Sequence, residues 1–230
     1  MKLSKLAAAA RLAQKYEFPD IFTQATQCLL TLFPEKFEDW VAKESERASQ
    51  LLPSDAIEAI VLFRSLSLDA MLPSAFYLAS QVPTSTILNG TKRADGVPVQ
   101  LYQQDIARCL GLKSECMRAS ATAYEAVFGV NTGKACKRWF GSCEKALKAA
   151  SARYRLAALH GDPLGRALRE LVERAGEDRS AGICDGCWAR CIEIEWEERA
   201  KIWSRCESRK TVCNVDRKTS VRRARIRVQD

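Results

Sequence analysis

The sequence predicts an all-α protein: a multi-helix bundle of roughly eight to ten helices in two subdomains, followed by a disordered basic tail. Apolar side chains recur every three to four positions along most of the 230 residues, which is the spacing of helices that bury one face. Alanine, leucine, arginine, lysine and glutamate dominate, and runs of β-branched residues are rare, so the composition favours helices over strands. The 7 prolines and 11 glycines are few, which also suits helices.

The first subdomain, residues 1–82, is predicted to hold five helices. The dipeptide Phe18-Pro19 stops the first helix and Pro19-Asp20 opens the second. In the third, Phe37 and Trp40 should face inward and the charges of Lys43–Arg47 outward. Pro53-Ser54-Asp55 has the composition of a helix start. The predicted segments are 3–16, 19–33, a third beginning at 34, a fourth beginning at 53, and 68–81 with a bend or break at Pro73.

Residues 83–98 are predicted to be a loop, with room for a short strand, because Asn89-Gly90 and Asp95-Gly96 favour turns. The second subdomain then covers 99–206. Its predicted helices are 101–110 and 113–128, separated by Gly111, followed by 136–154, 163–175 and 184–206. The tail, 207–230, has the composition of a disordered end.

The net charge of +8 is concentrated at the C-terminus. From Arg205 to Asp230 there are nine basic and three acidic residues, a net of +6, whereas the other 204 residues carry 27 bases and 25 acids, a net of +2. Because the body is nearly neutral, only the tail is a candidate for nucleic-acid binding or nuclear import. It has no aromatic residue on which a base could stack. The candidate nucleic-acid-binding residues are Arg222, Arg223, Arg225 and Arg227.

The sequence carries no clear targeting signal. The uncharged apolar run Leu6–Ala10 is too short for the core of a signal peptide and ends at Arg11. No stretch reaches the roughly 18 apolar residues of a membrane span. Ten cysteines without a secretory signal indicate reduced thiols or metal ligands. We therefore expect an intracellular protein, cytoplasmic and/or nuclear, that does not bind membranes.

Two stretches carry a family pattern. In AARLAQKYEFPDIFTQATQCLLTLFP, a helix ending in Lys15-Tyr16-Glu17-Phe18-Pro19 leads into an amphipathic helix closed by Phe33-Pro34; in DAIEAIVLFRSLSLDAMLPSAFYLAS, the element Leu72-Pro73-Ser74-Ala75-Phe76-Tyr77 follows an apolar helix. Together they resemble the helical region C-terminal to the BTB/POZ fold in fungal BTB domain-containing proteins. The likeness continues more loosely through YQQDIARCLGLKSEC, the cysteines at 136 and 143, and ICDGCWARCIEIEWEERAKIW. It covers roughly residues 5–204.

This resemblance implies a BACK-like helical subdomain over 1–82 and a function in partner binding. BTB domains form homodimers and recruit partners, the helices after them extend that platform, and in some animal BTB proteins this region supports docking on a cullin scaffold. Two features depart from the family. The BTB fold would lie upstream of residue 1, so homodimerisation through it is not expected of these residues. From Ser204 onward the chain is basic, where family members usually end in a short Leu-Pro-x-x-Phe-type apolar segment.

Four cysteines form two pairs with metal-ligand character. Cys184-Asp185-Gly186-Cys187 is a Cys-x-x-Cys motif, whose two thiolates can meet one tetrahedral ion. Cys136 and Cys143 are separated by six residues, a looser spacing. Together the pairs predict a structural Zn²⁺ site that would join the last helix to the 136–154 segment, with Cys191 as a substitute ligand.

Other interpretations of the cysteines stay open. They could be buried small hydrophobic residues, as unpaired cysteines often are. A redox Cys-x-x-Cys is less favoured, because no strand–helix alternation of the thioredoxin type surrounds it. Cys28 and Cys109 fall on apolar helix faces and are expected in the core.

The tryptophans Trp188, Trp196 and Trp203 form one stripe with Ile192 on the last predicted helix. Core packing is the usual meaning of such a stripe. The sharper alternative is a partner-binding surface, because aromatic anchors dominate binding hot spots.

No reactive constellation is evident. His160, the single histidine, precedes Gly161-Asp162-Pro163 and is expected at the surface near a helix start, and no acid or nucleophile is mapped beside it. The acids Glu193, Glu195, Glu197 and Glu198 are explained by a solvated, salt-bridged helix face. The sequence therefore predicts a non-enzymatic protein-interaction or scaffold module with unidentified protein partners; the alternative is a nucleic-acid-binding or nuclear protein that acts through its tail.

Overall fold

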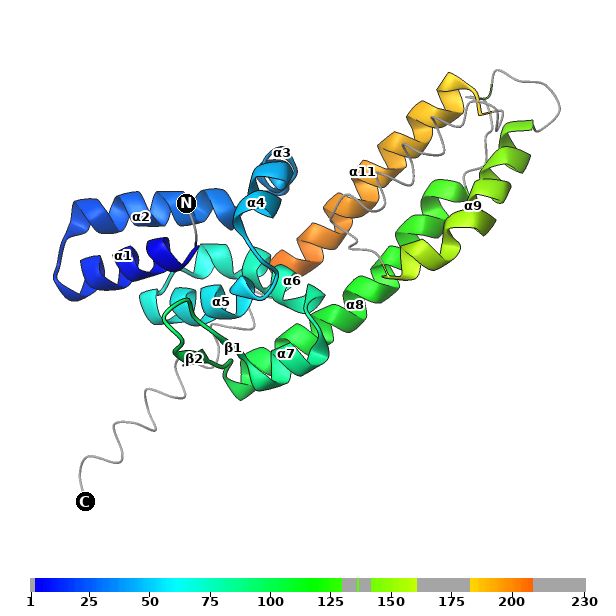
Figure 1. The fold of residues 1–230 in the computed structure, drawn as a ribbon. Helices are drawn as coiled ribbons and strands as arrows, with labels where there is room; N and C mark the ends of the chain where they lie inside the picture. The colour runs from blue at the N-terminus through cyan, green and yellow to red at the C-terminus, as the bar shows by residue number, and fades with distance from the viewer. Residues whose placement is uncertain (1–2, 130–135, 137–141, 161–182, 209–230) are drawn as a thin grey trace. The chain divides into compact units, whose positions relative to one another are not determined.

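A computed structural model describes residues 3–129, 136, 142–160 and 183–208 (Figure 1). Within these ranges it contains ten α-helices, one 3-10 helix and one two-stranded sheet. The predicted all-α class and the predicted range of eight to ten helices are confirmed. The predicted helix 163–175 and the tail from residue 209 lie outside the described residues.

The contacts within the chain define two compact units. The first contains Met1–Leu112 together with the residues from Arg205, and the second contains Lys113–Ser204. The division falls inside α8 (Gln103–Phe128), whereas the sequence predicts the break at 83–98. Helix α8 runs without interruption through Gly111, so the predicted end at residue 110 is wrong. A glycine inside a helix costs only about 1 kcal/mol, and burial of the neighbouring Cys109 and Leu112 outweighs that cost.

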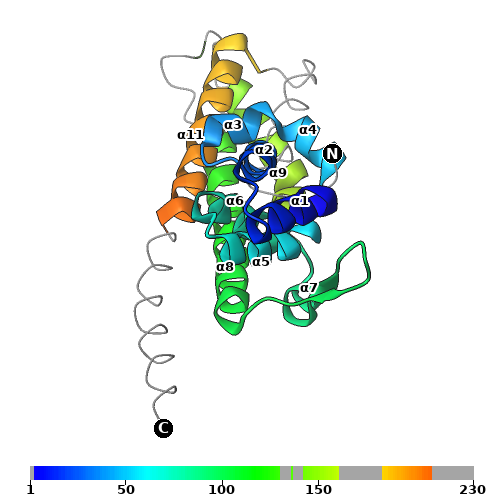
Figure 2. The same ribbon diagram turned by 90° about the vertical axis from the view of Figure 1, so that its left-hand side faces the viewer.

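The first unit begins with a pair of neighbouring helices, α1 (Leu3–Lys15) and α2 (Pro19–Leu32). They lie side by side in Figures 1 and 2, and α1 also packs against α5 (Asp55–Leu66). The face that α1 buries consists largely of small side chains, which lets the neighbouring backbones approach closely. These buried residues are Leu3, Leu6, Ala7, Ala10 and Ala13.

Aromatic pairs fill the core between α5 and its neighbours. Phe33, just after α2, meets Phe63 of α5 edge to face with ring centroids 5.1 Å apart. Trp40 and Tyr77 form a second edge-to-face pair at 5.4 Å. Tyr77 belongs to α6 (Leu72–Gln81), which follows the 3-10 helix η1 (Asp69–Met71). Pro73 is the second residue of α6, so it starts this helix instead of bending a longer one.

The third predicted helix is instead two short ones, α3 (Phe37–Ala42) and α4 (Glu44–Gln50). Arg47 was expected to face outward, but it is only 5% exposed. Its guanidinium lies 3.4 Å from the centre of the Trp40 ring and donates a hydrogen bond of 3.0 Å to the Trp40 carbonyl oxygen. This cation–π contact and hydrogen bond compensate for the loss of water around the charge.

The segment predicted to be a loop, 83–98, is largely ordered. It forms α7 (Thr84–Asn89) and the first strand of an antiparallel pair, β1 (Thr91–Lys92), whose partner is β2 (Pro98–Val99). Gly90 joins α7 to β1 with φ of +78°, and an added Cβ there would lie 2.2 Å from the Val99 carbonyl oxygen. Only glycine fits this position, so the predicted Asn89-Gly90 turn ends a helix and begins a hairpin.

The second unit combines the C-terminal part of α8 with α9 (Ser142–His160) and the portion of α11 (Asp185–Ser208) that ends at Ser204. Tyr124 of α8 donates its hydroxyl hydrogen to the Ser151 carbonyl oxygen of α9. The Cys191 thiol of α11 donates to the Val127 carbonyl oxygen of α8 at 3.6 Å. Residues of α8 therefore contact both α9 and α11.

Among the described helices, none combines the length and the apolar character that crossing a lipid bilayer requires.

Candidate metal centre

Four cysteine sulfurs meet in the second unit. The Sγ atoms of Cys136, Cys143, Cys184 and Cys187 all lie within 4.8 Å of one another. These are the four residues that the sequence predicts as metal ligands, and the two pairs are 41 residues apart when counted from Cys143 to Cys184. None of the four is in a disulfide. The arrangement is able to bind a metal ion.

Two helix starts bring the sulfurs together. Cys143 is the second residue of α9, and Cys187 is the third residue of α11. Cys184 directly precedes α11, and its carbonyl oxygen accepts the N–H of Trp188 at 3.0 Å, which begins the helical hydrogen bonding. The start of a helix carries unpaired N–H groups and a partial positive charge, which favour thiolates over thiols.

A direct hydrogen bond also links the two segments. The backbone N–H of Cys184 donates to the Cys143 sulfur at 3.3 Å. A hydrogen bond of this kind stabilises an anionic sulfur, and in zinc-thiolate sites it orients the ligand. The N–H at the beginning of α11 therefore holds the sulfur at the beginning of α9 in place.

Two of the four clustered cysteines are fully buried and two are half-buried. Cys143 and Cys187 are 0% and 1% exposed, whereas Cys136 and Cys184 are half-buried. Burial raises the pKa of the Cys143 thiol, and the N–H of Cys184 opposes that rise. Burial likewise raises the pKa of Cys187, and the neighbouring thiols Cys184, Cys136 and Cys143 raise it further. A bound cation would supply the charge that favours the ionised form of these two buried thiols.

The size of the cluster fits one ion. Zinc bonds four thiolates at about 2.3 Å in a tetrahedron, which places the sulfurs about 3.8 Å apart. A maximum separation of 4.8 Å means that the sulfurs would move together by about 1 Å or less on binding. An iron–sulfur cluster contains several metal ions and holds its cysteines at its corners, so it would need a wider arrangement.

Cys191, the predicted substitute ligand, lies outside this cluster. It is buried one helical turn after Cys187, its thiol donates to the Val127 carbonyl oxygen, and burial raises its pKa to about 11. Cys109 is buried as expected, but Cys28 is exposed, so its predicted place in the core is wrong. Cys28 lies beside the face of α2 that buries Ala25, Leu29 and Leu32, and not on it.

The tryptophans of the predicted stripe differ in exposure. Trp188 is half-buried, Trp196 is 42% exposed and Trp203 is buried, so the tryptophan stripe is partly core and partly surface. His160 is the last residue of α9, and the helix predicted to start after it lies outside the described residues. The candidate nucleic-acid residues Arg222, Arg223, Arg225 and Arg227 lie outside the described residues.

One buried ion pair, Glu195 with Arg199, was not predicted from the sequence. Glu195 was assigned to the solvated face of the last helix, but it is 4% exposed and accepts a hydrogen bond of 3.1 Å from Arg199, which is fully buried. The available signal was spacing, because Glu195 and Arg199 continue the i, i+4 series that starts at Cys187 and Cys191. Glu193 does face solvent and pairs with Arg190, as expected.

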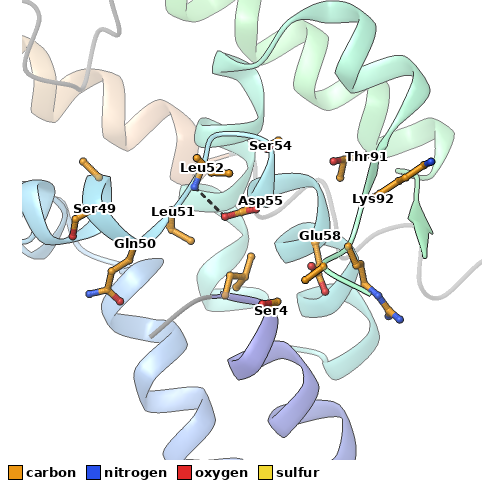
Figure 3. Close-up of a pocket in the computed structure, with 14 residues that line it drawn as sticks. Ser4, Ser49, Gln50, Leu51, Leu52, Ser54, Asp55, Glu58, Thr91 and Lys92 are labelled. Atoms are coloured by element: carbon orange, nitrogen blue, oxygen red, sulfur yellow. Dashed lines mark hydrogen bonds between the residues drawn. The ribbon is translucent and has the colours of Figure 1, made fainter. Parts of the chain in front are cut away.

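A pocket of about 650 Å³ with a mixed lining lies in the first unit, between the starts of α1 and α5, the end of α4 and the segment after α7 (Figure 3). Its carboxylates have partners within the chain. Figure 3 shows Asp55 directed back to the N–H of Leu52, at 2.9 Å, and Glu58 accepts from Arg11 at 3.0 Å. The acids are further balanced by Lys92 and Arg93 in the lining. This mixed lining selects no ligand chemistry.

Comparison of the chain with protein-family models, curated proteins and solved structures found no match. The resemblance to the region after the BTB fold therefore stays a prediction.

Proposed function

We propose that this chain is a non-enzymatic interaction or scaffold module whose second unit is stabilised by one structural Zn²⁺ ion. The observation that carries the zinc assignment is the convergence of four cysteine sulfurs within 4.8 Å. Zinc is favoured because four thiolates suit a borderline-soft ion with tetrahedral geometry. Protein sulfurs would fill all four positions, which is typical of structural sites, because a catalytic zinc keeps one position open for water or substrate.

The ion would join the beginnings of two helices that are distant in sequence. Cys136 and Cys143 would hold the start of α9, and Cys184 and Cys187 the start of α11. A cross-link between distant segments removes entropy from the unfolded chain, and binding only to the folded form adds its free energy to folding. Through α11, the ion would fix the position of the exposed Trp196.

The scaffold role is supported by the resemblance of residues 5–204 to post-BTB helices and by the exposure of Trp196, an aromatic residue of the kind that anchors partners. An affinity-purified complex from cells of the source organism would identify the partner by mass spectrometry. We expect Trp196→Ala to weaken that complex, and Trp203→Ala to be a poor control because its side chain is core. A partner retained equally by the wild type and by Trp196→Ala would contradict a role for this residue.

Metal analysis tests the zinc site. Purified full-length protein should contain one equivalent of zinc per chain, and Co²⁺ substitution should give the intense visible bands of tetrahedral thiolate coordination. Cys143→Ser should lose the metal. Cys191→Ser is the matched control. It also replaces a buried cysteine of the second unit, but Cys191 is not one of the four clustered cysteines. Stoichiometric metal in Cys143→Ser would refute the assignment.

The second candidate function rests on the composition of the tail, which carries a net charge of +6 from Arg205 to Asp230. Such a segment could bind nucleic acid by releasing counterions from the phosphates. Deleting residues 209–230 should then abolish salt-sensitive retention on DNA or RNA. Under the scaffold proposal, the same deletion should leave the protein complex intact. Measuring both with one deletion variant separates the two functions.

A further inference from the structure

The two segments that build the metal centre each contribute one buried and one half-buried cysteine. Cys143 and Cys187 are inaccessible to solvent, whereas Cys136 and Cys184 are partly accessible. A structural zinc site that is fully enclosed is protected from reagents in solution. Here two of the four cysteines, Cys136 and Cys184, lie partly at the surface.

Access matters because zinc-bound sulfurs keep thiolate character, and the thiolate is the form that oxidants attack. The product of the first attack, a sulfenic acid, condenses with any thiolate within reach. All four sulfurs lie within 4.8 Å of one another, so each accessible sulfur has three potential partners. The same closeness that favours the metal therefore favours a disulfide once oxidation has begun.

We infer that the four-cysteine centre is an oxidation site: a hydroperoxide attacks Cys136 or Cys184, a disulfide forms within the four-cysteine set, and the metal leaves. This inference rests on the zinc site proposed above. In the balanced reaction, one hydrogen peroxide and four protons react with the zinc tetrathiolate; two of the protons enter water and two go to the remaining thiolates. Two thiolates give up two electrons and become a disulfide, and the peroxide is reduced to two waters. Zn²⁺ is released, and the other two thiolates take up protons.

Oxidation would remove the link that the ion makes between the two helix starts. After the reaction, the Cys184 N–H and the helix starts no longer face an ion-bound cluster of thiolates. A disulfide inside Cys184-Asp185-Gly186-Cys187 would leave α9 unconnected to α11, whereas a disulfide between the two segments would replace the ion by a covalent bond. Either disulfide changes how strongly α11 is attached to α9. Identifying the two cysteines in the new disulfide shows which product forms.

Titration of the zinc-loaded, full-length protein with hydrogen peroxide tests this inference. Released zinc is followed with a chromogenic chelator, and the modified cysteines are identified by differential alkylation and mass spectrometry. We expect one zinc released and one disulfide formed for each peroxide consumed, with Cys136 or Cys184 in that disulfide. A dithiol reductant with added zinc should restore the starting state. Cys28→Ser, which removes an exposed cysteine of the first unit, should release zinc at the wild-type rate.

Each other outcome counts against a definite step. Protein that binds zinc but keeps it under excess peroxide refutes the oxidation site and leaves the structural zinc site standing. Zinc release that accompanies loss of helical circular dichroism, with Cys136 and Cys184 still reduced, also refutes it, because unfolding and not access would then be the cause. Protein that binds no zinc at all refutes the zinc proposal and the oxidation site together.

Discussion

Buffered removal of zinc should lower the thermal stability of this chain by an amount that follows from mass action. An ion that binds only the folded state adds about 2.7 kcal/mol when free zinc is 100 times its dissociation constant, and about 4.1 kcal/mol at 1,000 times. For a cooperative chain of this size, each kcal/mol shifts the midpoint by about 2–4 °C. The expected shifts are therefore roughly 5–11 °C and 8–16 °C.

The four sulfurs of the site lie close together only in the folded chain, because Cys143 and Cys184 are 41 positions apart and are joined by the packing of the second unit. The unfolded chain still contains the Cys184–Cys187 pair, and any zinc bound there would reduce the shift. The predicted values are for that reason upper bounds. The dependence on zinc concentration is the more direct signature of the folded site.

Thermal unfolding followed by far-ultraviolet circular dichroism, in a series of zinc buffers, measures this dependence. The wild type and Cys191→Ser should show midpoints that rise with free zinc, whereas Cys143→Ser should show a constant midpoint. A wild-type midpoint that does not change across the series, in protein shown to be reduced, would refute the argument that the cluster binds an ion in the folded state.

Three further predictions concern the packing around the site and in the first unit. Arg199→Ala should destabilise the fold by about 3–5 kcal/mol, because it leaves the buried Glu195 carboxylate without its guanidinium, and the double variant Glu195→Gln/Arg199→Met should recover much of that loss in chemical denaturation. Phe63→Ala should cost about 3–5 kcal/mol in the same assay, because Phe63 is fully buried against Phe33. Burial raises the pKa of the Cys109 thiol from 9.0 to about 12, so the unfolded chain loses this proton first as the pH rises. Stability should be independent of this thiol below pH 9.0 and should fall between pH 9.0 and about 12, by up to about 1.4 kcal/mol per pH unit, and Cys109→Ala should show a shallower fall.

The boundaries of several helices were predictable because their signals are local. Phe18-Pro19 separates α1 from α2 as predicted, and α11 begins within one residue of the predicted position. The weaker predictions concern interruptions. Gly111 was interpreted as a break, yet a glycine is tolerated inside a well-packed helix. The bend or break predicted at Pro73 corresponds to the start of α6 at Leu72, after a 3-10 helix, because a proline suits the first turn of a helix.

The sequence by itself predicted the all-α class and the identity of the four clustered cysteines, because helical periodicity and the spacing within each cysteine pair are local features of the chain. The tertiary structure alone decided which charges are buried. Arg47 and Glu195 are charged residues of the kind usually found at the surface. Arg47 is buried against the Trp40 ring, and Glu195 is buried against the Arg199 guanidinium. It also decided that the four sulfurs lie within 4.8 Å and that Cys136 and Cys184 are only half-buried, because distance and exposure depend on how segments 41 residues apart pack together.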